Sequence, residues 1–589
     1  MTTPLDIARN TVLAATTVAG MLREDPLLLV VQASRRLPRR LIAMVSRALL
    51  VGRAHGQVRE VAGHWLGGHR GAATEAVRRA RPRGPVARRL LYELAVELEA
   101  VPPSVLPAGR ARARAAWRAG DLSGAVESAR TAGAVRLAER LAAERATLDP
   151  MYAVPHGPAA ESRTRAGGTP RAFHLLTNSL PHTSSGYALR SQALLHAQAA
   201  AGIEVVAATR LGYPMSIGRP LAPGCEVVDG IPYQRLLPWR MPATATARAV
   251  RSVELSRPIA DRLGATVVHT TTPFGNGQIA RALAAELGVP WVYEVRGLLE
   301  QTWVAARPGT GQQARAAASE RFRLLRDQEA AVASSADRVI TLSRTLQEDL
   351  AARGVPRERI TVVPNGVDDR LLALPHREPA DCRRDLGLPE QGFWVGTVSS
   401  LVGYEGLDTL IDAVALLRAD GLDVRACLAG DGVARPELER RAHRAGVDDA
   451  VVFPGRVPAA DAARWHRALD VFVVPRRDLE VCRRVTPLKP VEAMALGRPV
   501  VASDLPALAE VLAGGAGLLV APDDAAALAD ALATLHADPA RRASLAAAGR
   551  TVAAERTWRS QGLRYRQVYE QLAAEWALGS SAAPDGGRR

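Results

Sequence analysis

The stretch KPVEAMALGRPVVASD (residues 489–504) joins a short helical segment, which Glu492 opens, to a buried apolar strand. Apolar runs of the same kind recur on both sides of it, and helical stretches separate most of them. The earlier runs are FHLLTNS (173–179), IEVVAAT (203–209), ATVVHTT (265–271), PWVYEV (290–295), DRVITLS (337–343) and ITVVPN (360–365). The later runs are FWVGTVSS (393–400), VRACLAG (424–430), VVFPG (451–455), VFVVP (471–475), PVVASD (499–504) and GLLVAP (517–522). Alternating strands and helices predict parallel sheets covered on both faces. Two such series in tandem predict an α/β protein with two doubly wound, Rossmann-like domains and a ligand at the carboxyl ends of the strands.

The chain before residue 153 has a different composition and predicts an all-α N-terminal domain. Alanine, arginine and leucine recur there at helical spacing, and strand patterns are absent. The stretch AWRAGDLSGAVESAR (116–130) resembles one helical-hairpin repeat of the tetratricopeptide kind. The stretch RRLPRRLIAMVSRALL (35–50) sets arginines beside an apolar face, which suits an anionic membrane surface or a packed helical hairpin. The predicted boundaries are a helical domain at 1–152, a linker at 153–170, Rossmann-like domains at 171–378 and 379–578, and a disordered tail at 579–589.

The charge of the chain favours anionic partners. The formal net charge is +16, but zinc-finger spacing and basic stripes interleaved with aromatic residues are absent, so nucleic acid is not an expected partner. All the basic residues except Lys489 are arginine, which makes this single ammonium group informative. The four cysteines are far apart, and neither a signal peptide nor a membrane-spanning apolar run is visible. We therefore expect a cytoplasmic protein that can associate with the inner face of the membrane.

Two strand–loop–helix junctions offer small polar residues and backbone N–H groups to a ligand. The first carries Ser185, Gly186 and Tyr187, and a helix begins there. Exposed N–H groups at a helix start attract phosphate or a sugar oxygen, and glycine permits close approach. The second junction carries Ser399, Ser400 and Gly403 after the strand that opens the second domain. We expect the two loops to face each other across a cleft.

The stretch around Glu492 also carries a resemblance to a known family. EAMALGRPVVASD (492–504) resembles the motif E-x7-E-A-M-A-x-G-x-P-V-V-A-(S/T)-D of family-4 retaining glycosyltransferases of the GT-B fold, and VVPNGVD (362–368) and ACLAGDG (426–432) resemble the family too. The resemblance covers about residues 171–575. It implies an acceptor-binding first domain, a nucleotide-sugar-binding second domain and Glu492 bound to the donor ribose. It further implies transfer of a hexose from a UDP- or GDP-sugar, with retention and without a metal cofactor, to a polysaccharide, a lipid-linked glycan or a glycolipid.

The chain departs from the family pattern where charge is concerned. The first glutamate of the motif falls on Arg484, and the arginine and lysine that usually hold the diphosphate fall on Ser400 and Glu405. We infer a relocated clamp in which Arg484 and Lys489 neutralise the departing diphosphate. The alternative is a degenerate site in a scaffold for polysaccharide assembly, which binds partners through residues 1–152.

The first domain contributes further candidates. The family often has H-x-H after the strand at 265–271, and only His269 is kept here because Thr271 stands at the second position. His269 is the catalytic candidate of this domain. Glu294 and Arg296 follow the next strand and are predicted to lie on the acceptor side, with a structural ion pair as the alternative reading. A nucleotide-sugar epimerase would require several carboxylates and histidines in the cleft, and the sequence does not supply them.

Overall fold

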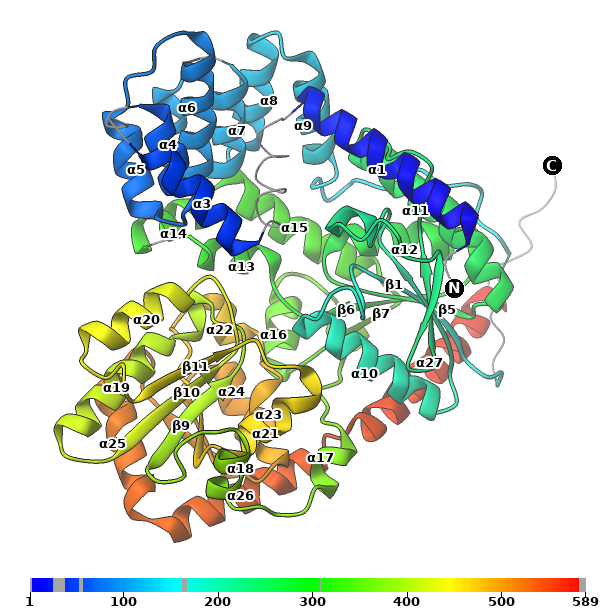
Figure 1. Ribbon diagram of the computed structural model, residues 1–589. Coiled ribbons are helices and arrows are strands. Elements are labelled where there is room, and N and C mark those ends of the chain that lie inside the picture. Colours follow the sequence, from blue (N-terminus) through cyan, green and yellow to red (C-terminus); the bar gives the residue numbers. More distant parts are fainter. Residues whose placement is uncertain are drawn as a thin grey trace.

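The computed structural model describes residues 3–24, 38–51, 57–107, 109–161, 167–307 and 309–581. Figure 1 shows three parts: a helical array, and two α/β units that each contain one sheet. The array lies over the first unit, and the second unit lies beside both of them. Of the described helices, none combines the length and the apolar character needed to cross a lipid bilayer.

The N-terminal region is entirely helical in its described parts. Helices α3 to α9 pack in chain order, each against the next, as in a repeat array. The predicted hairpin at 116–130 is present: Gly120, in the left-handed region at φ 96°, ends α7, and the Asp121 carboxylate caps α8. The helices are α1 (Pro4–Glu24), α3 (Arg39–Leu50), α4 (Val58–Leu66), α5 (Arg70–Arg79), α6 (Pro85–Leu98), α7 (Arg110–Ala119), α8 (Leu122–Thr131) and α9 (Val135–Ala146).

The first α/β unit contains an eight-stranded sheet of order β3-β4-β2-β1-β5-β6-β7-β8. All its neighbouring strands are parallel except the β3–β4 hairpin at the edge, which the sequence did not reveal. The strands are β1 (Arg171–Leu176), β2 (Glu204–Thr209), β3 (Cys225–Val228), β4 (Ile231–Arg235), β5 (Val267–Thr271), β6 (Trp291–Val295), β7 (Arg338–Thr341) and β8 (Ile360–Val362). The helices are α10 (Gly186–Ala200), α11 (Ala245–Leu263), α12 (Phe274–Leu287), α13 (Leu299–Ala305), α14 (Thr310–Ala317), α15 (Glu320–Ser335) and α16 (Arg344–Ala352).

The second α/β unit contains a six-stranded, wholly parallel sheet of order β11-β10-β9-β12-β13-β14. Its strands are β9 (Phe393–Val398), β10 (Val424–Ala429), β11 (Val451–Gly455), β12 (Val471–Val474), β13 (Val500–Ser503) and β14 (Leu518–Val520). Its helices are α17 (Asp369–Ala373), α18 (Pro379–Asp385), α19 (Leu407–Ala419), α20 (Arg435–Arg444), α21 (Ala462–Arg467), α22 (Glu480–Arg484), α23 (Lys489–Ala495), α24 (Pro506–Val511), α25 (Ala525–Ala537) and α26 (Pro539–Ala554).

Helices cover both faces of each sheet, which explains the nearly continuous apolar runs of the strands. In β1, Phe173 and Leu175 face the core formed with α11, α12, α15 and α16. The alternate residues Ala172 and Leu176 face the core formed with α10. In the second unit one core includes α19, α20 and α25, and the other includes α23, α24 and α26. The predicted fold class, two Rossmann-like domains after an all-α region, is confirmed.

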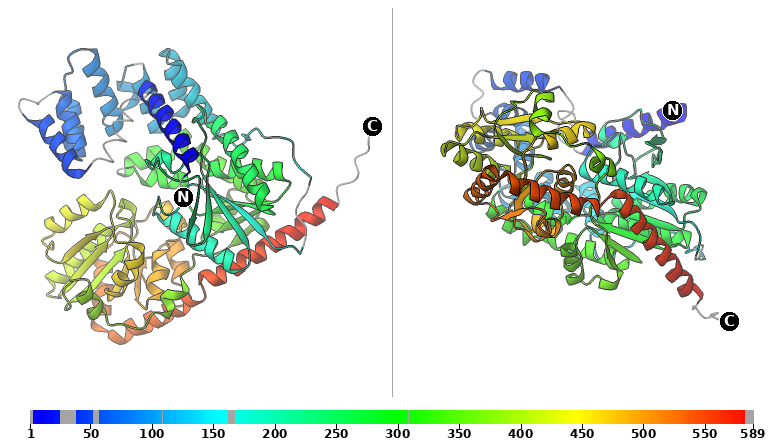
Figure 2. Two further views of the ribbon diagram at one scale, coloured as in Figure 1. Left: turned by 45° about the vertical axis from the view of Figure 1, so that its right-hand side comes forward. Right: turned by 90° about the horizontal axis from the view of Figure 1, so that it is seen from below.

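The last helix corrects the predicted domain boundary. Helix α27 (Trp558–Ser581) follows the second unit in the chain but packs on the first sheet, where Tyr565, Tyr569 and Leu572 join the core beside α10. Figures 1 and 2 show this red helix running away from the second unit along the first. The first domain is therefore discontinuous, and 558–578 belongs to it because the apolar face of α27 covers that sheet. Of the tail predicted at 579–589, residues up to 581 are helical and the rest lie outside the described residues.

The helical array and the predicted linker are both tied to the first α/β unit. Leu122 and Leu148 pack against Leu324 and Leu325 of α15. Nearby, the Glu320 carboxylate accepts hydrogen bonds from the Ser123 backbone N–H at 2.7 Å and from Arg145 at 2.9 Å. The linker also packs on this unit: Gly157 N–H donates to Glu286 at 2.7 Å, and Ala160 N–H donates to the Ala285 carbonyl at 3.1 Å.

Candidate active site

The carboxyl edges of the two sheets face each other, as the sequence predicts for a shared ligand site. Arg456, which follows β11, donates a hydrogen bond at 2.7 Å to the carbonyl of Ser184, which follows β1. Elsewhere along this boundary, the Asn365 amide donates to the Thr486 carbonyl at 3.2 Å. Side chains after strands of both sheets therefore meet in one region.

The β1–α10 loop presents its predicted residues at this boundary. The Ser185 hydroxyl caps α10 by accepting from Ala188 N–H at 3.2 Å. A Cβ added at Gly186 would have no neighbour within 4 Å, so the space beside it is open. Tyr187 is half-exposed, and its hydroxyl lies where a side chain at Gly297 would be, 2.7 Å from that Cβ position. This first turn of α10 can receive a polar ligand.

The loop after β9 is held by close backbone contacts with its neighbours. Ser399 N–H donates to the Ala429 carbonyl at 3.0 Å, and a Cβ at Gly430 would lie only 1.8 Å from the Ser399 carbonyl oxygen. Gly406, at φ 66°, would bring a Cβ to 1.9 Å from the Pro475 carbonyl oxygen. These glycines permit the loops after β9, β10 and β12 to pack together. Ser400 and Gly403 remain exposed at the surface of that cluster.

A buried arginine that the sequence analysis missed neutralises the β9 loop. Arg476, directly after β12, forms a two-bond ion pair with Glu405 at 2.8 and 3.2 Å and donates to the Val485 carbonyl at 3.0 Å. Burial works against the charge of the Arg476 guanidinium, but Glu405 outweighs it and raises the pKa of this group. Glu405 occupies the position of the expected phosphate-binding lysine, and it is paired with a cation from the next loop. The dipeptide Arg476-Arg477 directly after the apolar run was the available sequence signal.

Glu492 and Lys489 form one ion pair at the start of α23. The Lys489 ammonium lies 2.9 Å from the Glu492 carboxylate, and both side chains are partly exposed, at 31% and 20%. His466 lies behind them, buried, with its Nε2 atom 3.7 Å from the same carboxylate oxygen. Burial and the charge of Lys489 hold the pKa of His466 well below its ordinary value, so the ring is neutral. Both ring nitrogens lack a hydrogen-bond partner among the described residues, so His466 adds an unpaired polar edge behind Glu492.

Arg484 lies on α22 at the contact between the two α/β units. Its guanidinium pairs with Glu480 of its own helix at 3.3 Å and with Asp349 of α16 at 3.5 Å. The side chain is 37% exposed. In this structure the two predicted clamp cations, Lys489 and Arg484, are therefore each paired with carboxylates, and they share no carboxylate partner. A diphosphate would have to replace Asp349 or Glu480 at Arg484.

The structure buries His269, Glu294 and Arg296, which the sequence analysis assigned to catalysis and acceptor binding. Tyr569 of α27 lies 2.6 Å from His269 Nδ1, and Glu294 lies 3.2 Å from His269 Nε2. Burial lowers the pKa of His269 despite the nearby Glu294 carboxylate. These side chains are 3% exposed or less, with Tyr569 of α27 against His269 and Ser191 of α10 against Arg296, which excludes substrate contact in this conformation.

Glu294 is the centre of that buried network. It pairs with Arg190 at 2.8 Å and with Arg296 at 3.0 Å. Burial opposes its ionisation, but Arg296 and then Arg190 outweigh that effect and hold the pKa of Glu294 well below its ordinary value. The geometry therefore supports the alternative interpretation, in which Glu294 and Arg296 form a structural ion pair. Thr271, at the end of β5, is also buried.

Among the described residues, no group of three or more His, Cys, Asp and Glu side chains is arranged to hold a metal ion. The candidate site consists of partly exposed polar groups on loops and first helical turns from both units. Those of the first unit are Ser185, Gly186 and Tyr187. Those of the second unit are Ser399, Ser400, Gly403, Arg456, Arg484, Lys489 and Glu492.

Comparisons with known proteins point to one family. Residues 392–538 match the family "Glycosyl transferases group 1", and residues 185–366 match the family "Glycosyl transferase 4-like domain". The chain is 33% identical to the lipopolysaccharide core biosynthesis mannosyltransferase LpsB of Rhizobium meliloti, over 32% of this chain and 54% of that protein. It is 32% identical to a D-inositol 3-phosphate glycosyltransferase of Xylanimonas cellulosilytica, over 52% of this chain and 72% of that protein. It is 33% identical to a GDP-mannose-dependent phosphatidylinositol monomannoside mannosyltransferase of Mycolicibacterium smegmatis, over 40% of this chain and 63% of that protein. The chain thus spans about half the length of LpsB and more of the other two.

Solved structures share the arrangement of the two sheets. Sucrose-phosphate synthase from Thermosynechococcus elongatus superposes with a TM-score of 0.57 at 25% identity, over 69% of this chain and 100% of that one. Anabaena HepE in complex with UDP superposes with a TM-score of 0.51 at 19% identity, over 69% of this chain and 100% of that one. On these matches and the paired Rossmann-like sheets, the chain belongs to the group 1, family-4 type glycosyltransferases of the GT-B fold and is a transferase enzyme.

Proposed function

We propose that this glycosyltransferase moves a hexose from a UDP- or GDP-sugar to a polysaccharide, a lipid-linked glycan or a glycolipid, with retention at the anomeric carbon. The observation that carries the proposal is the partly exposed Glu492 carboxylate in the first turn of α23, at the carboxyl edge of the second sheet. An ionised carboxylate only accepts hydrogen bonds, so it suits the two hydroxyls of a donor ribose. The neutral His466 ring behind it adds a polar edge without a competing charge.

The names of the matched proteins support this donor and acceptor class. One relative is a GDP-mannose-dependent mannosyltransferase acting on a phosphatidylinositol monomannoside, and another acts in lipopolysaccharide core biosynthesis. HepE has been solved with UDP and with UDP-glucose. Because these names include a GDP-sugar, UDP and a UDP-sugar, both UDP and GDP are retained as the nucleotide of the donor.

The chain's own cations would stabilise the departing diphosphate without a metal ion. Lys489 is within 2.9 Å of Glu492, so the proposed diphosphate position is next to the proposed ribose position. Arg484 would exchange Asp349 for the diphosphate when donor binds, which would also loosen one contact between the two units. Charge on the diphosphate grows as the sugar leaves, so these cations would act more strongly on the transition state than on the bound donor.

The acceptor would bind on the first domain, at Ser185 and Tyr187 of the β1–α10 loop, and Gly186 between them would lie against the donor. The helical array supplies a candidate membrane contact on α3, where the exposed apolar side chains of Leu41, Met44 and others lie beside exposed arginines. A basic, apolar helix face of this kind fits an anionic bilayer surface, and assembly proteins are the alternative partner. The proposed location is the cytoplasm, at the inner face of the membrane.

The role of Glu492 is tested by calorimetric titration of UDP and GDP. Glu492→Ala removes a charge-assisted hydrogen bond worth about 1.5–3 kcal/mol, so we expect about a 10- to 100-fold loss of nucleotide affinity. Glu492→Gln keeps one acceptor oxygen and should lose less. Glu439→Ala, which removes an exposed carboxylate of α20 in the same domain, is the matched control and should bind as the wild type does. Equal affinity in a folded Glu492→Ala variant would refute the assignment.

A further inference from the structure

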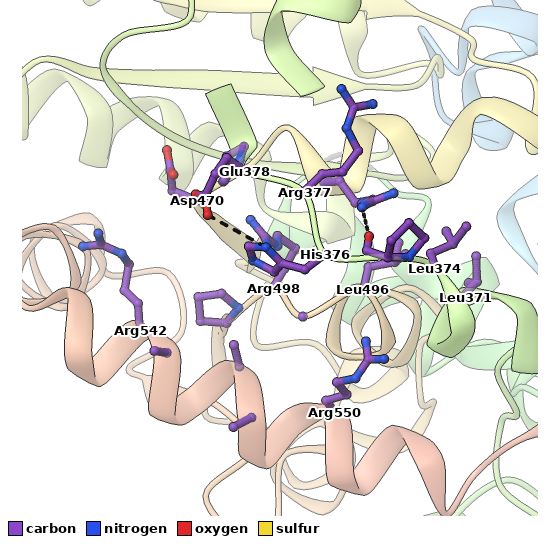
Figure 3. Close-up of a pocket in the computed structure, with 18 of the residues that line it drawn as sticks. Leu371, Leu374, His376, Arg377, Glu378, Asp470, Leu496, Arg498, Arg542 and Arg550 are labelled. Carbon is purple, nitrogen blue, oxygen red and sulfur yellow. Dashed lines mark hydrogen bonds and ion pairs between the residues drawn. The ribbon is translucent and has the colours of Figure 1, made fainter. Parts of the chain in front are cut away.

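A cavity lies at the edge of the second sheet opposite the proposed donor site. It has a volume of about 580 Å³, and its lining includes Asp470 and Arg498, which precede β12 and β13. These are the amino ends of the strands, whereas Glu492 and Lys489 follow the carboxyl end of β12. Helix α26 and the segment 371–379, which leads from the first domain into the second, complete the walls. Figure 3 shows Arg542 and Arg550 rising from the same helix on the side of Arg498.

Four arginines of this cavity lack a carboxylate partner among the described residues. Their guanidinium groups donate only to backbone carbonyls. Arg498 donates to Leu469 at 3.1 Å, and Arg550 donates to Ala495 at 2.9 Å and also to Leu372. Arg542 donates to His536 at 3.0 Å and to Leu535, and Arg467 donates to Pro375. Hydrogen bonds to carbonyl oxygens satisfy these donors but supply no counter-charge.

The acidic residues of the lining offset these charges only in part: Asp470 and Glu378 favour the charged form of Arg498, but five arginines line the cavity against these two acids. Asp470 is already paired with Arg383 at 3.1 Å and accepts from the Trp394 backbone N–H at 2.8 Å. Glu378 is 70% exposed and lies 3.8 Å from His376. A fifth arginine, Arg377, is paired with Asp385 at 2.6 Å. The cavity therefore carries an excess of positive charge, and Arg467 acts against the charge of Arg498.

Arg498 shows that the cavity contains a prepared polar group. The residue is only 7% exposed, and its Nε atom is buried without a hydrogen-bond partner among the described residues. Burial lowers the pKa of Arg498 even though Asp470 is nearby. A buried guanidinium with an unpaired donor carries a desolvation cost, and an anion bound in the cavity that Arg498 lines would offset this cost. Guanidinium groups match phosphate oxygens in geometry, often through two parallel hydrogen bonds.

We propose that this cavity is a binding site for a phosphorylated small molecule, separate from the nucleotide-sugar site. Arg498 and the arginines around it (Arg467, Arg542 and Arg550) would hold the phosphate and the other polar groups of this molecule. The volume falls in the range of small-molecule sites and exceeds the needs of a phosphate ion alone. Apolar residues of the lining, including Leu374 and Leu496, would contact the organic part.

The proposal is tested by calorimetric titration of the full chain with glucose 6-phosphate and with inorganic phosphate, at constant ionic strength. Binding of glucose 6-phosphate is expected, with at least about a tenfold loss of affinity in Arg550→Gln and in Arg542→Gln. Arg541→Gln is the matched control, since Arg541 is exposed on the same helix and does not line the cavity. Arg550 is exposed, so its variant is expected to fold even if Arg498→Gln does not.

A second comparison separates this site from the donor site. Glu492→Ala should bind glucose 6-phosphate as the wild type does, whatever it does to UDP or GDP. Loss of binding in Glu492→Ala with retention in Arg550→Gln would put the phosphate at the donor site and overturn the proposal. Wild-type protein that binds neither probe would overturn it too, and so would equal binding in the wild type and Arg550→Gln. Binding of inorganic phosphate with the same dependence on Arg550 supports the phosphate position.

Discussion

The buried carboxylate of Glu294 offers a sharp test of how the first domain is held together. Glu294→Gln keeps the size of the side chain and removes its charge. In the native protein this carboxylate faces Arg190 at 2.8 Å, Arg296 at 3.0 Å and His269 at 3.2 Å, with none of these side chains more than 5% exposed. The amide oxygen can still accept hydrogen bonds on one side, but the NH₂ group would face a guanidinium on the other. The variant therefore leaves two buried cations without their counter-charge.

The expected cost follows from that geometry. Removing one partner of a buried ion pair costs about 3–5 kcal/mol, because an uncompensated charge stays in the interior. A domain of this size shifts its unfolding midpoint by roughly 2–4 °C per kcal/mol, so the first domain should melt about 6–20 °C lower. Glu254→Gln is the matched control, since Glu254 is 52% exposed beside Arg251 on α11. An exposed pair contributes at most about 1 kcal/mol.

The same substitution predicts a pH signature. The folded pKa of Glu294 is held well below its ordinary value of 4.5, so its ion pairs stabilise the fold fully above that pH. This contribution is lost as the pH falls through the lower folded pKa. Differential scanning calorimetry should therefore show a constant gap between wild type and Glu294→Gln from pH 7 to pH 5, and a narrower gap in more acidic buffer. An unchanged unfolding midpoint in Glu294→Gln, together with an altered affinity for the acceptor, would refute the structural role of Glu294 and support its role in acceptor binding.

Three further predictions concern the proposed diphosphate clamp, the buried Glu329 of α15 and the last helix. Lys489→Ala should lower turnover more than donor affinity in a donor-hydrolysis assay, and Lys489→Arg should recover only part of that turnover. Ser400→Arg, which leaves the Glu405–Arg476 pair intact, should restore some activity to the Ala variant if the clamp has moved, whereas normal turnover in Lys489→Ala would rule the clamp out. Burial raises the pKa of Glu329 to about 7, so the free energy of unfolding should fall as the pH rises from 4.5 through 7. Glu329→Gln should reduce the difference in unfolding midpoint between pH 5 and pH 8, and an equal difference in the wild type and the variant would contradict this prediction. A chain that ends before α27 should lose soluble yield and native elution volume, because the face of the first sheet that contains Tyr569 becomes exposed; a soluble, monodisperse product would show that α27 is dispensable.

Local apolar patterns were sufficient to predict most of the fold. Each buried run of the sequence corresponds to a parallel strand, because strands covered by helices on both faces are apolar at nearly every position. The β3–β4 hairpin escaped prediction because its strands lie at the edge of the sheet, where alternate residues are exposed. The composition of CEVV (225–228) and IPYQR (231–235) is accordingly mixed, with a proline inside the second strand.

The predicted site residues divide according to what covers them. Ser185, Ser399 and Glu492 could be located from the sequence because a loop after a parallel strand must lie at the carboxyl edge of its sheet. The state of His269 could not be read in this way, since Tyr569, which covers it, lies 300 residues further along the chain. No local pattern predicts that α27 returns to the first domain.

The sequence by itself therefore determined the two Rossmann-like sheets, the helical N-terminal region and the strand ends at which donor chemistry is placed, because these depend on periodicity and on short motifs. Only the tertiary structure decided which charges are neutralised. It paired Glu405 with Arg476 and Arg484 with Asp349, and among the described residues it gave the arginines around Arg498 no carboxylate in ion-pair contact. The physical reason is that the electrostatic environment of a side chain depends on distances of a few ångströms between segments far apart in sequence, and packing alone sets those distances.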